Sequence, residues 1–124
     1  MEIVNASRGI TLSRGARFAG SFMSRFRGLM LTRERKDLVL AAVSESVDGA
    51  TIHMNMMLYP IDVAWVDSNM TVVDLARKVA PAPLWNPFEF HRPARAARYV
   101  VELGLGELGT TEIGDKIEFK ETKD

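Results

Sequence analysis

Two apolar segments joined by a short polar turn constrain the fold of this chain most. Residues 61–66 read IDVAWV and residues 71–79 read TVVDLARKV, and both are rich in the β-branched residues that favour strands. The four residues between them read DSNM, in which Asn69 tolerates a left-handed backbone. The sequence therefore predicts a β-hairpin with strands at residues 61–66 and 71–79.

Short apolar segments separated by Gly, Pro, Asn and Asp recur along the rest of the chain, which is typical of a mainly β domain. The further predicted strands cover residues 2–5, 10–12, 38–43, 51–57, 98–103 and 116–119. The chain has 124 residues, of which 47% are hydrophobic and 26% charged, and this fits one globular domain over residues 1–124. We expect a mainly β (α+β) fold with a compact, barrel-like antiparallel sheet.

One segment follows a helical period instead. Its apolar side chains recur at a spacing that places them on one face of a helix, namely Phe22, Met23, Phe26, Leu29 and Met30. Ser21 can cap its first turn. The pattern predicts an amphipathic helix over residues 21–30 that packs on the sheet. For residues 105–111 we expect at most a short helical turn, because the segment is rich in glycine.

Several classes of protein and site are excluded by what the sequence lacks. It has no cysteine, so disulfides, thiolate nucleophiles and cysteine metal sites are all ruled out. It also lacks a glycine-rich phosphate loop, a nucleophile elbow, a zinc signature and a calcium loop. No apolar run approaches the roughly 20 residues of a membrane span, and the first residues do not resemble a signal peptide. We therefore expect a cytoplasmic protein without a metal or cofactor.

The charges are unevenly distributed although the net charge is zero. Residues 1–36 carry eight cationic and two acidic side chains, whereas residues 102–124 carry three cationic and seven acidic ones. The basic third could bind the phosphates of RNA, or it could attract the acidic third within the fold. We favour attraction within the fold and expect no nucleic-acid binding, because no basic run is as long as a nucleic-acid-binding tail.

The segment at residues 51–62, TIHMNMMLYPID, has the most unusual composition. In an extended chain its side chains alternate, so His53, Asn55 and Met57 share one face. A neutral imidazole beside thioethers would suit Cu(I). Methionine fills irregular cores more often than it binds a metal, so we expect no metal here.

Asp62 is an acid on an apolar strand face, which it shares with Ala64 and Val66. A buried carboxylate needs a partner, which could be backbone N–H groups or an arginine such as Arg27. At the rim of a cavity it could instead bind a ligand or act as a general base together with His53.

The proline-rich segment at residues 81–93 reads PAPLWNPFEFHRP and predicts a long loop with aromatic side chains. Such a loop can form part of a binding site, or it can plug an open end of the barrel. We predict a small non-catalytic ligand-binding module, with an unknown small molecule bound by Arg27, His53, Asn55, Met57, Asp62 and Trp85. An RNA-binding module and a small enzyme that uses Asp62 and His53 are the alternatives. The oligomeric state is open.

Five segments together resemble a known family. They are FRGLM at 26–30, IHM at 52–54, YPIDVAWVD at 59–67, ARYVVELGLG at 97–106 and IGDKIEF at 113–119. In this order the segments resemble the uncharacterised family known as domain of unknown function 192, over about residues 2–120. The resemblance implies a compact, mainly β domain of a kind found in archaea and bacteria, and it implies no particular activity.

The resemblance also singles out positions, namely Arg27, Gly28, Leu29, Met30, His53, Met54, Pro60, Asp62, Gly114 and Asp115. The chain departs from the family pattern at KDLVLAAV (36–43), where a Gly-Met-Leu-Phe type of segment is expected, and at Leu58, where archaeal relatives often have a cation. Both changes would alter a shared pocket. Gly114 and Asp115 match a turn before the last strand, so we expect them to be structural.

Overall fold

The computed structural model describes residues 1–19, 37–47, 50, 52–53, 60–79 and 90–121. Within these ranges the chain forms ten strands and no α-helix. The strands are β1 (Glu2–Asn5), β2 (Ile10–Ser13), β3 (Arg17–Ala19), β4 (Leu38–Ser46), β5 (Ile52–His53), β6 (Ile61–Val66), β7 (Val72–Val79), β8 (Phe90–His91), β9 (Ala97–Gly104) and β10 (Ile117–Lys120).

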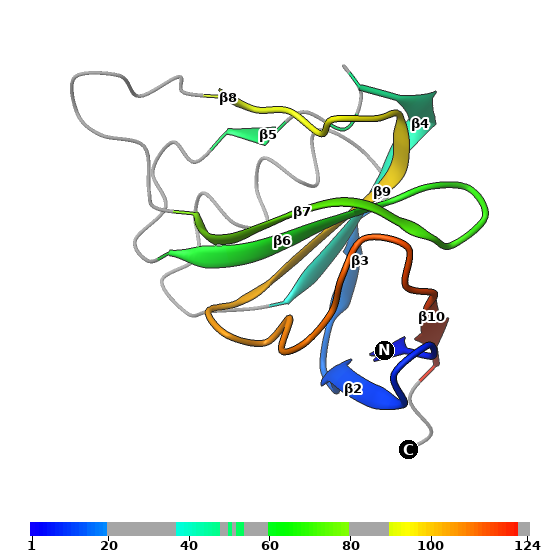
Figure 1. Cartoon of the computed structure of the whole chain (residues 1–124), viewed down its shortest axis with the longest axis vertical. Coiled ribbons are helices and arrows are strands. Elements are labelled where there is room, and N and C mark those ends of the chain that lie inside the picture. Colours follow the sequence, from blue (N-terminus) through cyan, green and yellow to red (C-terminus); the bar gives the residue numbers. More distant parts are fainter. Residues whose placement is uncertain (20–36, 48–49, 51, 54–59, 80–89, 122–124) are drawn as a thin grey trace.

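The strands form three sheets (Figure 1). The largest has the order β3-β4-β9-β6-β7, in which only β3 and β4 are parallel. The second has the order β10-β1-β2, and β5 pairs with β8 in the third. In the described part of the chain β3 and β7 do not pair with each other, so the five-stranded sheet remains open. The prediction of a mainly β fold is confirmed, and the prediction of a barrel is wrong.

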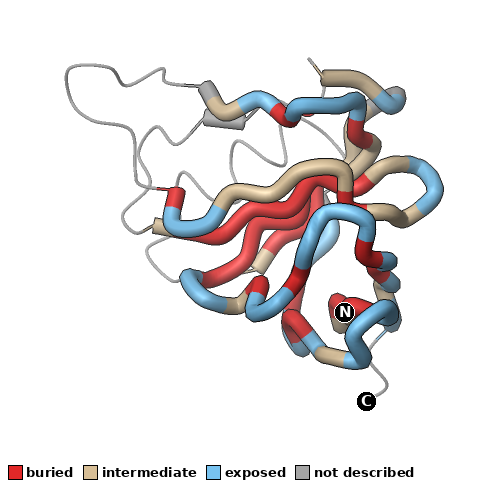
Figure 2. Tube along the Cα trace, viewed as in Figure 1, coloured by how far each residue is buried: buried red, intermediate tan, exposed pale blue. Residues whose placement is uncertain are grey.

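The two faces of the five-stranded sheet have different partners. Ala64, Val101 and Leu103 point to one face, where they pack with Ile3 and Leu12 of the three-stranded sheet. The other face belongs to a separate apolar cluster that includes Trp65. Figure 2 shows that the strands of this sheet are mostly buried. This alternation is the period-2 pattern of strands that are buried on both sides, and all six residues of β6 are buried.

The predicted hairpin is confirmed as β6 and β7, with a different residue in the left-handed conformation. Met70 has a φ of 64°, whereas Asn69 was expected to adopt it. Asn69 and Thr71 both donate their backbone N–H to Asp67 Oδ1, at 2.9 Å each. The carbonyl of Met70 accepts the N–H of Ile117 at 2.8 Å. The turn is therefore shaped by the Asp67 carboxylate and by a contact with Ile117 of β10. The turn propensities of single residues take neither contact into account.

The other predicted elements have mixed outcomes. Strands 2–5, 10–12, 38–43, 98–103 and 116–119 correspond to β1, β2, β4, β9 and β10, with shifts of one residue or more at most ends. The short strands β3 and β8 were not predicted, and β8 lies within the proline-rich segment that was expected to be all loop. Residues 105–110 form hydrogen-bonded turns, not a helix. The predicted helix over residues 21–30 lies outside the described residues.

No helix in the described ranges is long and apolar enough to cross a membrane.

Candidate functional site

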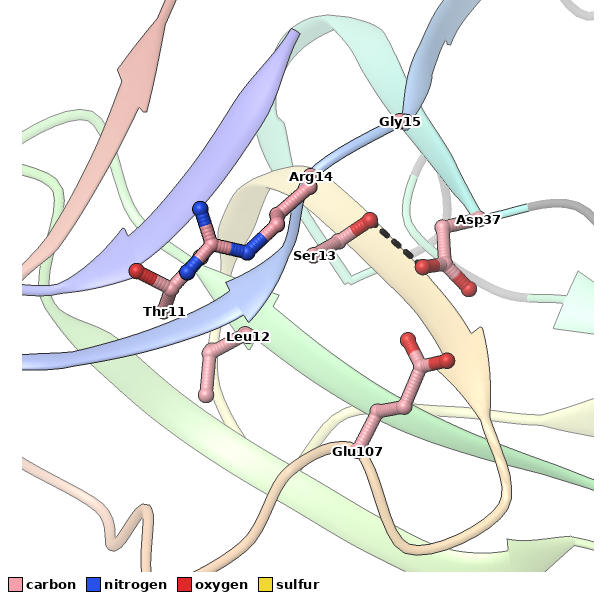
Figure 3. A pocket seen from close by; sticks show the side chains of 7 residues that line it. All are labelled: Thr11, Leu12, Ser13, Arg14, Gly15, Asp37 and Glu107. Carbon is pink, nitrogen blue, oxygen red and sulfur yellow. Dashed lines mark hydrogen bonds between the residues drawn. The ribbon is translucent and has the colours of Figure 1, made fainter.

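An open cavity of about 490 Å³ lies where three segments of the chain meet (Figure 3). The end of β2 and the turn after it form one wall. Asp37, just before β4, and Glu107, in the turns after β9, complete the lining. The lining residues are Thr11, Leu12, Ser13, Arg14, Gly15, Asp37 and Glu107. Most of them are polar or charged, so the cavity is suited to a polar ligand.

Asp37 joins the segments around the cavity. Ser13 Oγ donates a hydrogen bond to Asp37 Oδ2 at 2.5 Å, and the N–H of Gly104 donates to Asp37 Oδ1 at 3.0 Å. The backbone carbonyl of Asp37 accepts the N–H of Arg17 at 3.0 Å. One residue therefore connects β2, the start of β3 and the end of β9.

Asp62 holds the turn that carries Glu107. Its side chain is buried on the face of β6 that Ala64 and Val66 share, as predicted. Asp62 Oδ2 accepts the N–H groups of Gly106 and Leu108, at 3.0 and 3.3 Å, and these residues flank Glu107 in the sequence. Asp62 Oδ1 accepts the N–H of Lys78 at 3.0 Å. Lys78 lies in β7 and has a backbone φ of 57°. Of the two partners considered for Asp62, the structure shows the backbone N–H groups.

The other predicted binding residues are not brought together by the described part of the structure. His53 lies in β5, where its backbone pairs with Phe90 of β8. Arg27, Asn55, Met57 and Trp85 lie outside the described residues. Their role in binding stays a prediction, as does a direct role of Asp62.

The residues that line the cavity were not predicted from the sequence as a site. Ser13 and Asp37 are 24 residues apart in the sequence, and Asp37 and Gly104 are 67 apart. No motif spacing links such positions. The only sequence feature that could have pointed to the cavity is a polar or charged residue at the end of a predicted strand, such as Arg14 after β2 and Asp37 before β4.

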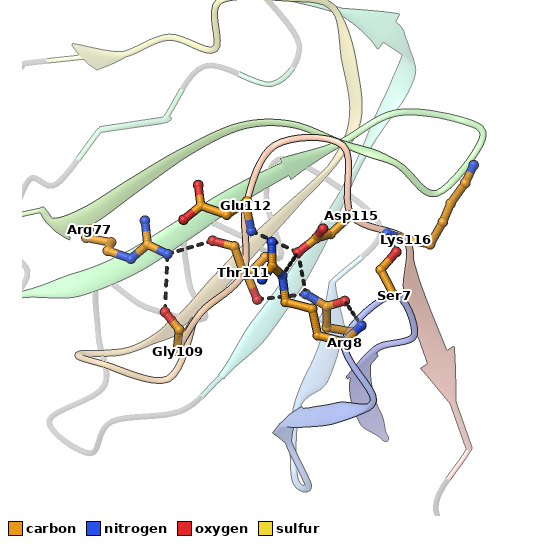
Figure 4. A network of polar contacts seen from close by, with 9 residues as sticks. Ser7, Arg8, Arg77, Gly109, Thr111, Glu112, Asp115 and Lys116 are labelled. Atoms are coloured by element: carbon orange, nitrogen blue, oxygen red, sulfur yellow. Dashed lines mark hydrogen bonds and ion pairs between the residues drawn. The ribbon is translucent and has the colours of Figure 1, made fainter.

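A second polar cluster, built around Asn5 and Asp115, connects the first and last strands (Figure 4). Asn5 is fully buried, and its Nδ2 donates to Thr111 Oγ1 and to Asp115 Oδ2, at 3.0 Å each. The same oxygen of Asp115 accepts Arg8 Nε at 2.5 Å and the N–H of Glu112 at 2.9 Å. These bonds satisfy a buried amide and fasten the β1–β2 turn to the segment before β10.

Gly114 and Asp115 therefore have the structural role that was expected. Gly114 has a φ of 97°, which a residue with a side chain rarely adopts. The N–H of Gly114 donates to the carbonyl of Val72 at 2.8 Å, and the N–H of Val72 donates to the carbonyl of Asp115 at 2.9 Å. The backbone conformation of Gly114 therefore allows this segment to form hydrogen bonds with Val72, at the start of β7, before β10 begins.

The Asp115 cluster predicts a defined loss of stability in acid. Hydrogen bonds from Arg8, Asn5 and the Glu112 N–H lower the pKa of Asp115 from 3.8 to about 2. A carboxylate whose pKa is lower in the folded state stabilises the protein above its unfolded-state pKa. This contribution should be complete above pH 4 and disappear as the pH falls towards 2. Urea titrations of the wild type and Asp115→Asn over this range should show a stability difference that shrinks with decreasing pH.

The matched control is Glu118→Gln, which removes an exposed carboxylate from β10. Its stability difference from the wild type should stay near zero over the same pH range. A difference for Asp115→Asn that is constant between pH 2 and 5 would contradict the role given to the ionised carboxylate.

The lining of the cavity determines which chemistry is available there. Within the described ranges no three His, Asp or Glu side chains come together in a way that could hold a metal ion. The carboxylates of Asp37 and Glu107 can accept hydrogen bonds and attract cations, and the Arg14 guanidinium can donate and attract anions. This arrangement is suited to binding a small polar molecule.

Comparison with known proteins places the chain in one family. The family model described as Uncharacterized ACR, domain of unknown function 192, matches residues 3–119. A UPF0127 protein of Thermococcus sibiricus is 36% identical over 121 residues, which cover 95% of this chain and 74% of the relative. A UPF0127 protein of Pyrococcus horikoshii is 37% identical over 119 residues, which cover 94% of this chain and 97% of the relative.

Two crystal structures share the fold at 19% sequence identity. A candidate transcription regulator of Sinorhizobium meliloti 1021 superposes with a TM-score of 0.77 over 94% of this chain and 89% of that one. A protein of unknown function from Novosphingobium aromaticivorans has a TM-score of 0.76 over 95% of this chain and 82% of that one. The fold agreement and the family match over nearly the whole chain lead to one conclusion: the protein belongs to the family of domain of unknown function 192.

Proposed function

We propose that this protein is a small, non-catalytic, cytoplasmic binding module, and that it binds a small polar molecule in the cavity between β2, Asp37 and Glu107. The observation that carries this proposal is the polar cavity itself, together with the buried carboxylate of Asp62 behind it. Its volume of about 490 Å³ falls in the range of about 300–1,000 Å³ that is common for ligand sites.

The walls of the cavity are held in place before any ligand binds. Asp37 connects the end of β2 to the end of β9, and Asp62 fixes both residues beside Glu107. Rigid walls lower the entropic cost of ordering side chains when a ligand binds. Two carboxylates on either side of the cavity therefore hold its walls in the same arrangement with and without a ligand.

The bonds of Asp62 also favour binding over catalysis. Both of its carboxylate oxygens accept backbone N–H groups, at 3.0 to 3.3 Å. A general base must lie within hydrogen-bond reach of the proton that it removes, and the Asp62 carboxylate is buried and does not line the cavity. We therefore assign Asp62 to the support of the cavity and not to acid–base chemistry with His53.

The proposal keeps the residues predicted from the sequence as further ligand contacts. These are Arg27, His53, Asn55, Met57 and Trp85. Asp62 belongs to this set and also supports the wall that carries Glu107. It does not line the cavity itself, and within the described residues it acts on the cavity by holding Gly106 and Leu108 in place.

Native mass spectrometry of protein purified from its own host tests the proposal. The wild type should retain a small molecule, and Gly15→Trp should lose it. Gly15 lines the cavity, and a Cβ built on it meets no atom within 4 Å, so a side chain can be added at this position without a clash at its first carbon.

The control variant is Ala96→Trp, which places the same side chain on an exposed position before β9. Gly104, which binds Asp37 of the cavity, lies at the other end of this strand, eight residues further along the chain, or about 26 Å along the strand at about 3.3 Å per residue. Ala96→Trp should retain the molecule. Retention by Gly15→Trp, or no bound molecule in the wild type, would contradict the proposal.

A further inference from the structure

Arg98, in β9, has a buried N–H group without a partner. Its Nη1 is buried and donates no hydrogen bond within the described part of the chain. No ion pair joins its guanidinium to a described carboxylate. Buried N–H groups of folded proteins nearly always have a partner, and each exception requires an explanation. The strongest partner for a cationic donor is an acceptor that carries a negative charge.

The strands on both sides of β9 leave Arg98 out of their ladders. On one side, the pairing of β6 ends opposite Tyr99. On the other side, the register of β4 shifts between Ala41, which lies opposite Tyr99, and Ser46, which lies opposite Ala97. Such irregularities are frequent beside functional sites, where they redirect a side chain. Arg98 therefore has no cross-strand partner among the described strands.

The guanidinium of Arg98 lies over an aromatic ring that is itself held in place. Its Cζ is 5.5 Å from the centroid of the Tyr99 ring. The Tyr99 ring contacts Phe119 of β10 edge to face, with the two centroids 5.4 Å apart and the rings at 81°. A guanidinium that lies over a ring keeps its N–H groups at its own edge, where they can bind two oxygens of one anion.

The connection that leads from β8 into β9 is basic (Figure 1). Residues 92–98 contain three arginines and no acid, namely Arg92, Arg95 and Arg98. Arg92 and Arg95 are exposed, and neither forms an ion pair with a described residue. Clustered cations without counter-charges raise the local concentration of anions.

The carboxylates of the adjoining segments are bound to backbone N–H groups and not to these arginines. Glu45, beside the β4 irregularity, accepts the N–H of Ser68 at 2.8 Å. Asp67, which follows β6, holds the hairpin turn. Asp74 accepts the N–H of Ala94 at 2.7 Å, which also fixes the basic connection to β7.

We propose that Arg98 binds the oxyanion group of a small molecule, which is a carboxylate or a phosphate. Arg98 is half-buried, so the anion approaches the exposed part of the guanidinium, and a rotation of the side chain brings Nη1 to a second oxygen. Arg98 does not line the cavity after β2, so this inference goes beyond the proposed function and does not depend on it.

NMR titration of the ¹⁵N-labelled full chain tests the inference through the arginine Nε–Hε signals. Inorganic phosphate, acetate and chloride are added in separate titrations at constant pH. Phosphate and acetate should shift the Arg98 signal to saturation. Chloride offers no second oxygen, so it should bind at least about tenfold more weakly than the better of the two oxyanions. The oxyanion that binds more tightly identifies the group that the ligand carries.

Two matched variants separate a site from general attraction by the basic connection. Arg98→Lys keeps the charge but cannot form two parallel hydrogen bonds, so the affinity for the better oxyanion should fall at least about tenfold. Arg95→Lys makes the same change at an exposed position of the same connection and should alter the affinity less than twofold. Equal losses for the two variants, or no saturable shift of the Arg98 signal, would overturn the inference.

A comparison of stability separates binding from a structural role. Arg98→Met removes an unpaired buried N–H group, so the midpoint of urea denaturation should stay the same or rise. The control is Arg77→Met, because Arg77 Nη2 donates to the carbonyls of Gly109 and Thr111, at 3.2 and 2.6 Å. Its midpoint should fall. An equally large fall for Arg98→Met would assign Arg98 to the support of the fold and overturn the inference.

Discussion

Replacement of Asp62 by alanine should lower the free energy of unfolding by at least about 3 kcal/mol. The carboxylate is buried and accepts three backbone N–H groups, from Lys78, Gly106 and Leu108. Alanine would leave these donors without acceptors, and an unsatisfied buried donor costs about 1 to 3 kcal/mol. Urea denaturation followed by tryptophan fluorescence measures the change.

Asp62→Asn separates the effect of charge from the effect of shape. The amide oxygen can keep one or two of the bonds, so the loss should be smaller, at about 1 to 3 kcal/mol. Asp74→Ala is the matched control, because Asp74 lies on the neighbouring strand and one of its two N–H partners is exposed. An Asp62→Asn variant that melts at the same or a higher temperature than the wild type would contradict the structural role and indicate that the charge is kept for a ligand.

Truncation of Trp65 should have a similarly large effect, at about 3 to 5 kcal/mol for Trp65→Ala. The side chain lies at the centre of the cluster on the face opposite the three-stranded sheet and is 2% exposed. Its Nε1 donates to the carbonyl of Ala50 at 2.8 Å. The variant loses the packing of a large aromatic ring and also leaves the carbonyl of a fully buried residue without this donor.

Trp65→Phe tests the two contributions separately. It keeps an aromatic ring and removes the indole N–H, so the loss in free energy of unfolding should be smaller than for Trp65→Ala. Equilibrium denaturation of the two variants measures this difference. Equal losses for the two variants would show that the hydrogen bond to Ala50 dominates and that ring packing adds little, contrary to this account.

The sequence predicted the parts of the fold that depend on local pattern. The β-branched residues of both segments and the polar turn between them sufficed for the hairpin, and Asp62 was placed correctly on the face of Ala64 and Val66. The left-handed residue of the turn was assigned to Asn69 because propensity favours asparagine. Met70 takes this conformation because its carbonyl bonds to Ile117, which lies far along the chain.

The candidate site could be predicted only in part, because its walls come together through tertiary contacts. Asp62 stood out as a charge within an apolar strand, whereas Asp37 precedes a strand and Glu107 lies in a turn, where a charge is ordinary. Only the folded chain shows that Asp62 fixes the residues on both sides of Glu107. The barrel was expected from the number of short strands, but strand number does not determine whether the edges of a sheet meet.

The central claim is that the protein binds a small molecule between β2, Asp37 and Glu107. The most direct test is a titration of the ¹⁵N-labelled protein with the small-molecule fraction of its host, followed by amide chemical shifts. We predict that the shifts concentrate on the lining residues Thr11, Leu12, Ser13, Arg14, Gly15, Asp37 and Glu107, and that Gly15→Trp abolishes them. Shifts that are absent throughout the lining of the cavity would contradict the claim.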